Sequence, residues 1–353
     1  MLTDIFARRY EKRPLFASVA SREHAFFVQA YRIINEQLIP YHGADKKVDE
    51  KAKTAWTSIH DRLTMELGVK ELSARYYSYQ GEWLGKPHQY SGYYDMNLVC
   101  DAWLTKQFTE DLDEDVFAKR RLSFVELAFR ERGAQIAQIN ANLPFTLQMA
   151  AYGDNRRSSI PGIKQLTGPE RAQAENDRVN REFTSHVYEL NERFKQAGMP
   201  LNYHNGFIQI TADEQIQVEI EEPFWSLVSD AKYKNVSTDV AEAIDRRDTG
   251  GRDPSFYAAK SLESAIKIIC EDKGWVTGTE KGVADFLNYM EAKANGPFIE
   301  PWERQSMQRF YSDVRNDLGH GPGSKEMPNF TPTQIDQTIE FCMSWVKSLI
   351  RRL

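Results

Sequence analysis

The chain has few cysteines and no long apolar run. Its 353 residues include three cysteines, Cys100, Cys270 and Cys342. An odd number of widely spaced cysteines, each in an apolar helical setting, predicts buried reduced thiols and argues against a disulfide framework or a zinc site. No segment approaches the roughly 18 apolar residues of a membrane-spanning helix, and the N-terminal residues lack the apolar core of a signal peptide. We therefore expect a cytoplasmic protein with no membrane partner.

The chain also lacks an excess of basic charge. Its 45 Lys and Arg face 51 Asp and Glu, which gives a formal net charge of −6. Proteins that coat nucleic acid non-specifically carry a strongly basic face, so this class is disfavoured. Contact with nucleic acid must come from a local patch or from a composite site between subunits. The run Lys119-Arg120-Arg121, with Arg130 and Arg132, is typical of a solvated helix face, or else forms a small basic patch for RNA or a partner.

Several catalytic motifs are absent as well. The sequence contains no His-Glu-x-x-His or Cys-x-x-Cys metal spacing, no Gly-x-x-x-x-Gly-Lys-Ser/Thr loop and no Gly-x-Ser-x-Gly elbow. We therefore expect no metal and no other cofactor. A catalytic site in this chain would then rely on side chains that transfer protons or hold phosphate without a metal.

What the sequence does contain is a pattern of amphipathic helices. Apolar residues at spacings of three and four, with glycine and proline at the ends, predict N-terminal helices over 22–38, 49–67, 95–108, 115–142 and 169–197. The fourth of these is expected to end before Pro144, with a linker from Tyr152 to Gly168. Residues 72–94 are rich in tyrosine and predict an ordered aromatic loop or short strands. Asn205-Gly206 between alternating apolar residues predicts a hairpin over 201–211 and little other sheet.

The predicted fold class is mainly α. A helical N-terminal domain with the small hairpin spans 1–212, and a connecting segment with a short helix spans 213–234. A bundle of four to five antiparallel helices spans 235–353. Its helices are expected at 237–248, 254–273, 281–294, 301–318 and 332–351.

Arg315, Asn316 and His320 are the main candidate site residues. They lie where helix 301–318 meets a turn rich in glycine. An arginine can hold a phosphate with a planar charged fork, and a histidine can exchange a proton near neutral pH. Asn316 is expected to orient the arginine or bind a phosphate oxygen. The trio suits phosphodiester cleavage, but a cation at a helix end and a histidine cap also fit a purely structural role.

Glu263 is the supporting residue. It falls among the apolar residues of helix 254–273, between Phe256 and Ile266, and a carboxylate in a buried stripe is seldom without a partner. We predict that Glu263 pairs with Arg315 and fixes its orientation; an ion pair that merely anchors the bundle is compatible with this. On helix 301–318 the apolar side is predicted to include Trp302.

These residues resemble a known family. An arginine, a polar residue and then a histidine at the end of a bundle helix resemble the signature of HEPN ribonucleases, in which four to six residues separate arginine from histidine. The stretch Ser255 to Cys270 with Lys273-Gly274-Trp275 is similar to the long helix of the abortive-infection C-terminal type of HEPN domain. The ending Arg-Asn-x-x-Gly-His-Gly-x-Gly is similar to the same group. The N-terminal part, from Met1 to Gln209, resembles an N-terminal domain of AbiJ-type phage-defence proteins.

The resemblance implies a metal-independent endoribonuclease effector of prokaryotic abortive-infection defence. Two subunits would form a homodimer through the C-terminal bundles, and their Arg/His motifs would line one composite cleft. An RNA 2′-hydroxyl would attack the neighbouring phosphate, with His320 as base or acid, Arg315 stabilising the phosphate charge and Asn316 positioning one or both. The partners implied are RNA, a second copy and a regulatory or phage-derived partner, with the N-terminal domain as sensor or restraint.

Two alternatives remain open at this stage. One is a non-catalytic HEPN-like binding or scaffold module in a defence or toxin–antitoxin system. The other is a metal-dependent nuclease, which the lack of a carboxylate cluster disfavours.

Overall fold

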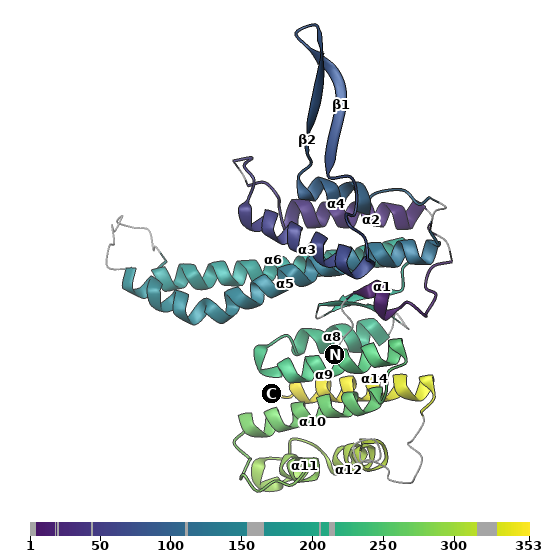
Figure 1. The fold of residues 1–353 in the computed structure, drawn as a ribbon. Coiled ribbons are helices and arrows are strands. Elements are labelled where there is room, and N and C mark those ends of the chain that lie inside the picture. The colour runs from purple at the N-terminus through teal and green to yellow at the C-terminus, as the bar shows by residue number, and fades with distance from the viewer. Residues whose placement is uncertain are drawn as a thin grey trace. The chain divides into compact units, whose positions relative to one another are not determined.

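A computed structural model describes residues 5–17, 19, 21–43, 45–109, 112–153, 166–204, 206–211, 216–315 and 330–353. The described part of the chain is mainly helical with two small antiparallel hairpins (Figure 1), which confirms the predicted fold class. Its residues group into two compact units, one up to Ile208 and one from Gln209 to Leu353.

The N-terminal unit packs its helices around large aromatic side chains. Trp56, Phe124 and Phe194 are fully buried. The elements are α1 (Phe6–Arg9), α2 (Ser21–Ile33) with its π-helical continuation η1 (Ile34–Leu38), α3 (Glu50–Leu67), α4 (Met96–Leu104), α5 (Glu114–Gly153) and α6 (Gly168–Ala197). The predicted helices over 22–38, 49–67, 95–108 and 169–197 are confirmed within a few residues.

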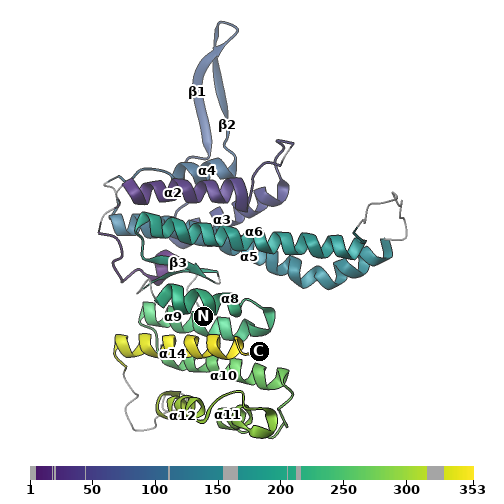
Figure 2. The same ribbon diagram turned by 180° about the vertical axis from the view of Figure 1, so that it is seen from behind.

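Helix α5 is longer than predicted. It runs from Glu114 to Gly153 and passes through Pro144, so the expectation that it ends before the proline is wrong. A proline inside a helix removes one hydrogen bond and costs about 3 kcal/mol relative to alanine. Helix α6 lies alongside the same stretch (Figure 2), and Asn140 and Asn180 exchange side-chain hydrogen bonds of 3.0 and 2.9 Å. Packing between the two helices offsets the cost of the proline. Most of the expected linker lies outside the described residues.

The described residues form two hairpins, whereas the sequence predicts one with little other sheet. Strands β3 (Leu201–His204) and β4 (Phe207–Ile210) form the hairpin expected around the Asn-Gly pair. Strands β1 (Tyr76–Trp83) and β2 (Lys86–Tyr93) form a longer one in the tyrosine-rich segment, so the expectation of little other sheet is wrong. Leu84 and Gly85 at its turn have φ of 51° and 75°. Two successive positive φ angles are typical of the tight turn that matches the twist of paired strands.

The basic run on α5 is not a solvated face. Lys119 and Arg121 are 2% and 3% exposed. The Lys119 ammonium donates hydrogen bonds to the carbonyl oxygens of Tyr10 at 2.7 Å and Arg13 at 2.6 Å. The Arg121 guanidinium donates to the carbonyl oxygen of Trp103 at 3.0 Å and lies 4.8 Å from the centroid of its ring. For these two residues both interpretations, solvated face and RNA patch, are wrong, because the cations satisfy backbone acceptors inside the unit.

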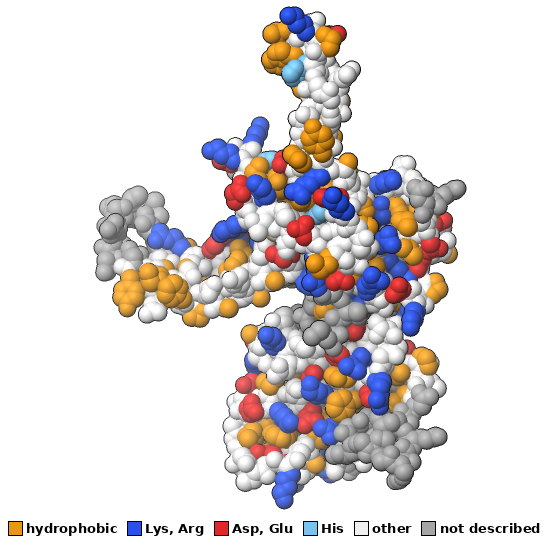
Figure 3. Space-filling model, in the orientation of Figure 1, with side chains coloured by type: hydrophobic (Ala, Val, Ile, Leu, Met, Phe, Trp, Pro, Cys, Tyr) orange, Lys and Arg blue, Asp and Glu red, His pale blue; other side chains and the backbone are white. Residues whose placement is uncertain are grey.

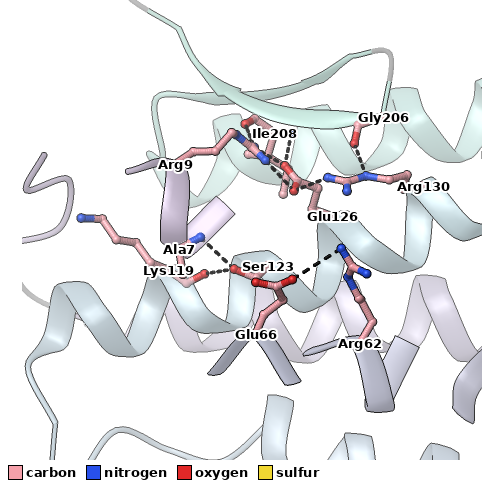
Figure 4. A network of polar contacts seen from close by, with 10 residues as sticks. All are labelled: Ala7, Arg9, Arg62, Glu66, Lys119, Ser123, Glu126, Arg130, Gly206 and Ile208. Atoms are coloured by element: carbon pink, nitrogen blue, oxygen red, sulfur yellow. Dashed lines mark hydrogen bonds and ion pairs between the residues drawn. The ribbon is translucent and has the colours of Figure 1, made fainter. Parts of the chain in front are cut away.

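A buried carboxylate on α5 joins segments of the N-terminal unit that are far apart in sequence (Figure 4). Glu126 is fully buried and accepts hydrogen bonds from Arg9 at 2.9 Å and Arg130 at 2.7 Å. It also accepts the backbone N–H of Ile208 at 2.7 Å, while Arg130 donates to the carbonyl oxygen of Gly206 at 3.1 Å. One side chain thus fixes α1, α5 and the β3–β4 hairpin together.

The C-terminal unit is a helical bundle built around α10. Helix α10 packs against α9, α11, α14 and η5, and its Leu262, Ile266 and Ile269 are fully buried. The elements are η2 (Gln217–Glu221), α8 (Glu222–Leu227), η3 (Ala231–Tyr233), α9 (Lys234–Thr249), α10 (Pro254–Asp272), α11 (Val283–Glu291), η4 (Lys293–Asn295), α12 (Pro301–Phe310), η5 (Tyr311–Arg315) and α14 (Pro332–Ile350). The predicted bundle helices are therefore present.

The predicted burial of Trp302 is wrong. Trp302, expected on the buried side of its helix, is 64% exposed. Its ring centroid lies 6.2 Å from that of Trp345 on α14. The two tryptophans line a surface groove of about 610 Å³ between α12 and α14 rather than the core.

Cysteines, membrane-spanning helices and metal ligands were each sought in the described part of the chain. Cys100, Cys270 and Cys342 are buried and unbonded, as predicted. Within the described ranges no helix has the length and apolar character needed to cross a bilayer. Among those same residues no three His, Cys, Asp or Glu side chains gather as metal ligands would.

Candidate active site

The candidate site lies where α12 ends against α10. Helix α12 begins with Pro301 in its first turn and a capping box between Glu300 and Glu303. It then widens into the π-helix η5, a form common at functional sites. Tyr311, the first residue of η5, is buried, and its hydroxyl donates to the carbonyl oxygen of Ala259 on α10 at 3.3 Å. Burial raises the pKa of Tyr311 well above its ordinary value, so this donor stays neutral while it fixes the helix end on α10.

Glu263 on α10 is the partner of Arg315 at the end of η5. Nη2 of Arg315 lies 3.5 Å from Oε2 of Glu263, and the two side chains are 30% and 14% exposed. The predicted ion pair is therefore present. Because the carboxylate is mostly buried and the guanidinium is partly open to solvent, Glu263 can orient Arg315 without hiding it.

The same carboxylate holds a second cation that the sequence analysis did not single out. Nζ of Lys267, one helical turn further along α10, lies 2.7 Å from Oε1 of Glu263. Each carboxylate oxygen thus faces one cation, and two positive charges meet one negative charge. The spacing of four residues from a glutamate to a lysine on one helix is the signal that would have found Lys267.

An aromatic ring also lies near Arg315. Its Cζ lies 5.9 Å from the ring centroid of Phe256, within the range of a cation–π contact. Phe256 was expected in the buried stripe of α10 but is half-buried at the edge of the site. Contact with a ring and a carboxylate restricts the rotamers of Arg315, which lowers the entropy lost when it binds a ligand.

This arrangement is suited to holding an anion. A guanidinium has five N–H groups in a planar fork, and its pair with Glu263 engages one nitrogen, so the fork can take a phosphate oxygen at the same time. The Lys267 side chain, 42% exposed, adds a second charge beside it. The described residues of this cluster provide charge stabilisation but no group that exchanges protons near neutral pH.

The two remaining candidates lie outside the described residues. Asn316 and His320 fall within 316–329, so their predicted roles stay predictions. Of the three catalytic candidates the structure places Arg315 alone, together with its supporting Glu263.

Comparison with known proteins bears on the N-terminal part. The family described as AbiJ N-terminal domain 4 matches residues 4–226. The matched region includes the first compact unit and continues into α8, past the domain boundary that we predicted at 212. No curated protein and no solved structure matches the chain. The likeness of the bundle to HEPN domains therefore remains an inference from its residues.

Proposed function

Because this chain belongs to the AbiJ N-terminal domain 4 family, which suggests a role in abortive-infection defence, we propose that its C-terminal bundle is a metal-independent endoribonuclease. The observation that carries the proposal is the ion pair between Arg315 and Glu263. It holds a phosphate-binding side chain at a helix end, five positions before a histidine in a turn rich in glycine.

The proposed reaction needs only proton transfer and charge stabilisation. The RNA 2′-oxygen attacks phosphorus while the 5′-oxygen of the next nucleotide leaves. His320 takes the proton from the 2′-hydroxyl or gives one to the leaving oxygen. Arg315, with Lys267 beside it, stabilises the charge that builds on the phosphate, and Asn316 positions one or both catalytic side chains. The products carry a 2′,3′-cyclic phosphate and a 5′-hydroxyl.

A second copy of the chain supplies the other half of the proposed site. A base and an acid each accelerate the reaction, and each copy offers one Arg315 and one His320. Two bundles packed face to face bring two of each into one cleft. This arrangement also raises the local positive charge of a chain that is acidic overall.

The purified full chain tests the proposal directly. RNA is incubated with it in excess EDTA, and product ends are identified by treatment with a cyclic-phosphate-removing kinase and by mass. We expect cleavage to persist without divalent ions and to stop when the attacked position is 2′-deoxy. His320→Ala and Arg315→Ala are each expected to lower the rate by about 100-fold or more.

Arg309→Ala is the matched control for these variants. Arg309 lies on the same helix as Arg315 but its side chain is 86% exposed and pairs with Asp313 at the surface. Its loss should leave the cleavage rate within about threefold of the parent. Expression of the parent is expected to arrest growth, and His320→Ala to relieve the arrest at equal protein level. Absence of cleavage, or equal toxicity of His320→Ala, would leave the non-catalytic binding module as the better assignment.

A further inference from the structure

The β1–β2 hairpin has two chemically different faces. Successive strand residues point to opposite sides, and residues paired across strands share a side. The register pairs Tyr79 with Tyr90 and Gln80 with Gln89, and Tyr94 continues it by donating to the carbonyl oxygen of Arg75 at 2.9 Å. One side, here named the aromatic face, carries Tyr77, Tyr79, Trp83, His88, Tyr90 and Tyr94. The other side carries serine, glutamine, glutamate and proline along most of its length, with the pair Tyr76 and Tyr93 at the base of the hairpin.

The rings of the aromatic face form a continuous row. Centroid distances are 5.0 Å from Tyr94 to Tyr77, 6.2 Å from Tyr77 to Tyr79, 5.3 Å from Tyr79 to Tyr90 and 4.7 Å from Tyr90 to His88. These lie in the range of favourable aromatic pairs. Each ring therefore helps to fix the next one in place.

Two glycines let the rings lie close against the strands. A Cβ at Gly92, which pairs with Tyr77, would lie 2.7 Å from the Tyr77 hydroxyl. A Cβ at Gly81 would lie 3.0 Å from the ring of Tyr90. Any larger residue at Gly92 would displace the ring that covers it. The row is thus a shaped surface and not a chance gathering of side chains.

This face has the pattern of a packed sheet but is not packed within its own unit. Antiparallel sheets with one apolar and one polar face usually lay the apolar face on a core, and an isolated two-stranded hairpin is marginal in water. None of residues 76–93 is buried, and Tyr79 and Trp83 are 57% and 62% exposed. Figures 1 and 2 show the hairpin standing away from the helices of its unit, and Figure 3 shows hydrophobic side chains gathered near its tip.

The charge and the exposed area of the aromatic face indicate what packs against it. Between 76 and 94 the chain has one acidic residue, Glu82, and one lysine, Lys86. A nucleic-acid strand would need several cations along its phosphates, whereas a neutral face can pack on its own copy without repulsion. Six half-exposed side chains of this size leave roughly 500–600 Å² open, so two copies would bury about 1,000 Å², the lower bound of a specific interface.

We propose that the aromatic face is a self-association surface on which the hairpin of a second copy packs face to face. The two hairpins run antiparallel, because a parallel overlay would place both copies of Lys86 together. The antiparallel overlay brings Lys86 of one copy to the base of the other, where the exposed Asp95 lies, and Trp83 over Tyr94. Such a contact is isologous, with the same residues contributed by both copies. It belongs to the N-terminal unit and does not depend on the proposed ribonuclease activity.

Sedimentation equilibrium of the full chain tests the proposal. The double variant Tyr79→Ser/Tyr90→Ser removes the centre of the aromatic face, and Gln80→Ser/Gln89→Ser is the matched control on the opposite face of the same strands. We expect the first to raise the dissociation constant of self-association by about tenfold or more, and the second to change it by less than about twofold.

A second measurement detects self-association even where the serine variant destabilises the hairpin. The three native cysteines are buried, and burial raises the pKa of the Cys270 thiol to about 12, so they resist labelling. Pyrene on Tyr79→Cys, at the centre of the aromatic face, should give excimer emission that rises with protein concentration. Pyrene on Gln80→Cys, on the opposite face, should not.

Unchanged self-association of the serine variant would overturn the proposal, as would excimer emission from both positions or from neither. If that variant loses binding to RNA or to another protein while it still self-associates, the face belongs to that partner and the proposal is wrong. A chain that cleaves no RNA but self-associates through the aromatic face would count against the ribonuclease alone.

Discussion

At the scale of single residues, Glu263 organises the candidate site through its two cations. We expect Glu263→Gln to lower ribonuclease activity by about tenfold or more, because Arg315 and Lys267 lose the charge that orients them. The free energy of unfolding should fall by only about 1 kcal/mol, since both cations reach solvent. Cleavage rate and urea denaturation of the same preparation measure the two effects.

Glu303→Gln is the control for this change. Glu303 pairs with Arg352 in the same bundle, with side chains 6% and 31% exposed, close to the values for Glu263 and Arg315. Its loss should cost at least as much stability as loss of Glu263 while leaving the cleavage rate per folded molecule unchanged. Equal losses of activity in both variants would show that Glu263 acts only through the stability of the bundle.

Glu221 gives the C-terminal unit a pH dependence. Burial raises the pKa of Glu221 to about 7, against the opposing charge of Arg247. A carboxyl whose pKa is higher folded than unfolded binds its proton more tightly in the native state. Stability contributed by this group is therefore present below pH of about 4.5 and is lost as pH rises towards 7.

We expect Glu221→Gln to remove this loss of stability with rising pH. Between pH 5 and 8 the variant should gain stability relative to the parent by at most about 3 kcal/mol. Urea denaturation across this range measures the difference. Glu219→Gln, at an exposed position in the same turn, should leave the pH profile of the parent intact.

At the scale of elements, Pro144 limits the local stability of α5. Pro144→Ala restores one backbone donor inside a helix at an exposed position and should slow amide exchange of residues 145–153 by up to about 100-fold. Hydrogen exchange with mass spectrometry reads this directly. Pro301→Ala should not slow amide exchange, because Pro301 lies in the first turn of α12. An N–H group added there has no acceptor within the helix. Unchanged exchange in Pro144→Ala would mean that α6 already sets the stability of this stretch.

Local sequence patterns predict most helices and strands, but they do not predict which residues each element packs against. The helix over 49–67 follows from apolar spacing and from Gly68, whose φ of 67° ends it. The residues of the β1–β2 hairpin favour a loop and strands alike, because tyrosine and glycine occur in both, and the strand pairing that decides between them is non-local. Lys119 and Arg121 looked like surface charges because their acceptors are backbone carbonyls elsewhere in the chain, such as those of Tyr10 and Trp103.

The candidate site was predictable to a similar degree. The pairing of Glu263 with Arg315 follows from a carboxylate in an apolar stripe and a cation at a neighbouring helix end. The exposure of Trp302 did not follow, because the rotation of α12 about its axis depends on how α14 packs against the bundle. The surroundings of Phe256 likewise depend on the π-helical end of α12. No residue type predicts a π-helical turn.

At the scale of the whole molecule, the proposed composite site would make activity a property of pairs. Arg315→Ala and His320→Ala should each be nearly inactive alone, yet a mixture should regain measurable cleavage, because a mixed pair still offers one arginine and one histidine. Cleavage rate against mixing ratio should peak near equal amounts. A mixture no more active than its components would indicate that each copy works by itself.

The carboxylate of Glu126 has a further consequence, for the order in which the chain is made. It binds Arg9 near the start of the N-terminal unit and Ile208 at its end, so the unit cannot close until residue 208 has left the ribosome. Domains generally fold as they emerge, at about 5–20 residues per second. Residue 208 therefore leaves the ribosome roughly 5–20 s before Arg315 does. A partner that recognises this unit could therefore bind a nascent chain before the proposed ribonuclease residues have emerged.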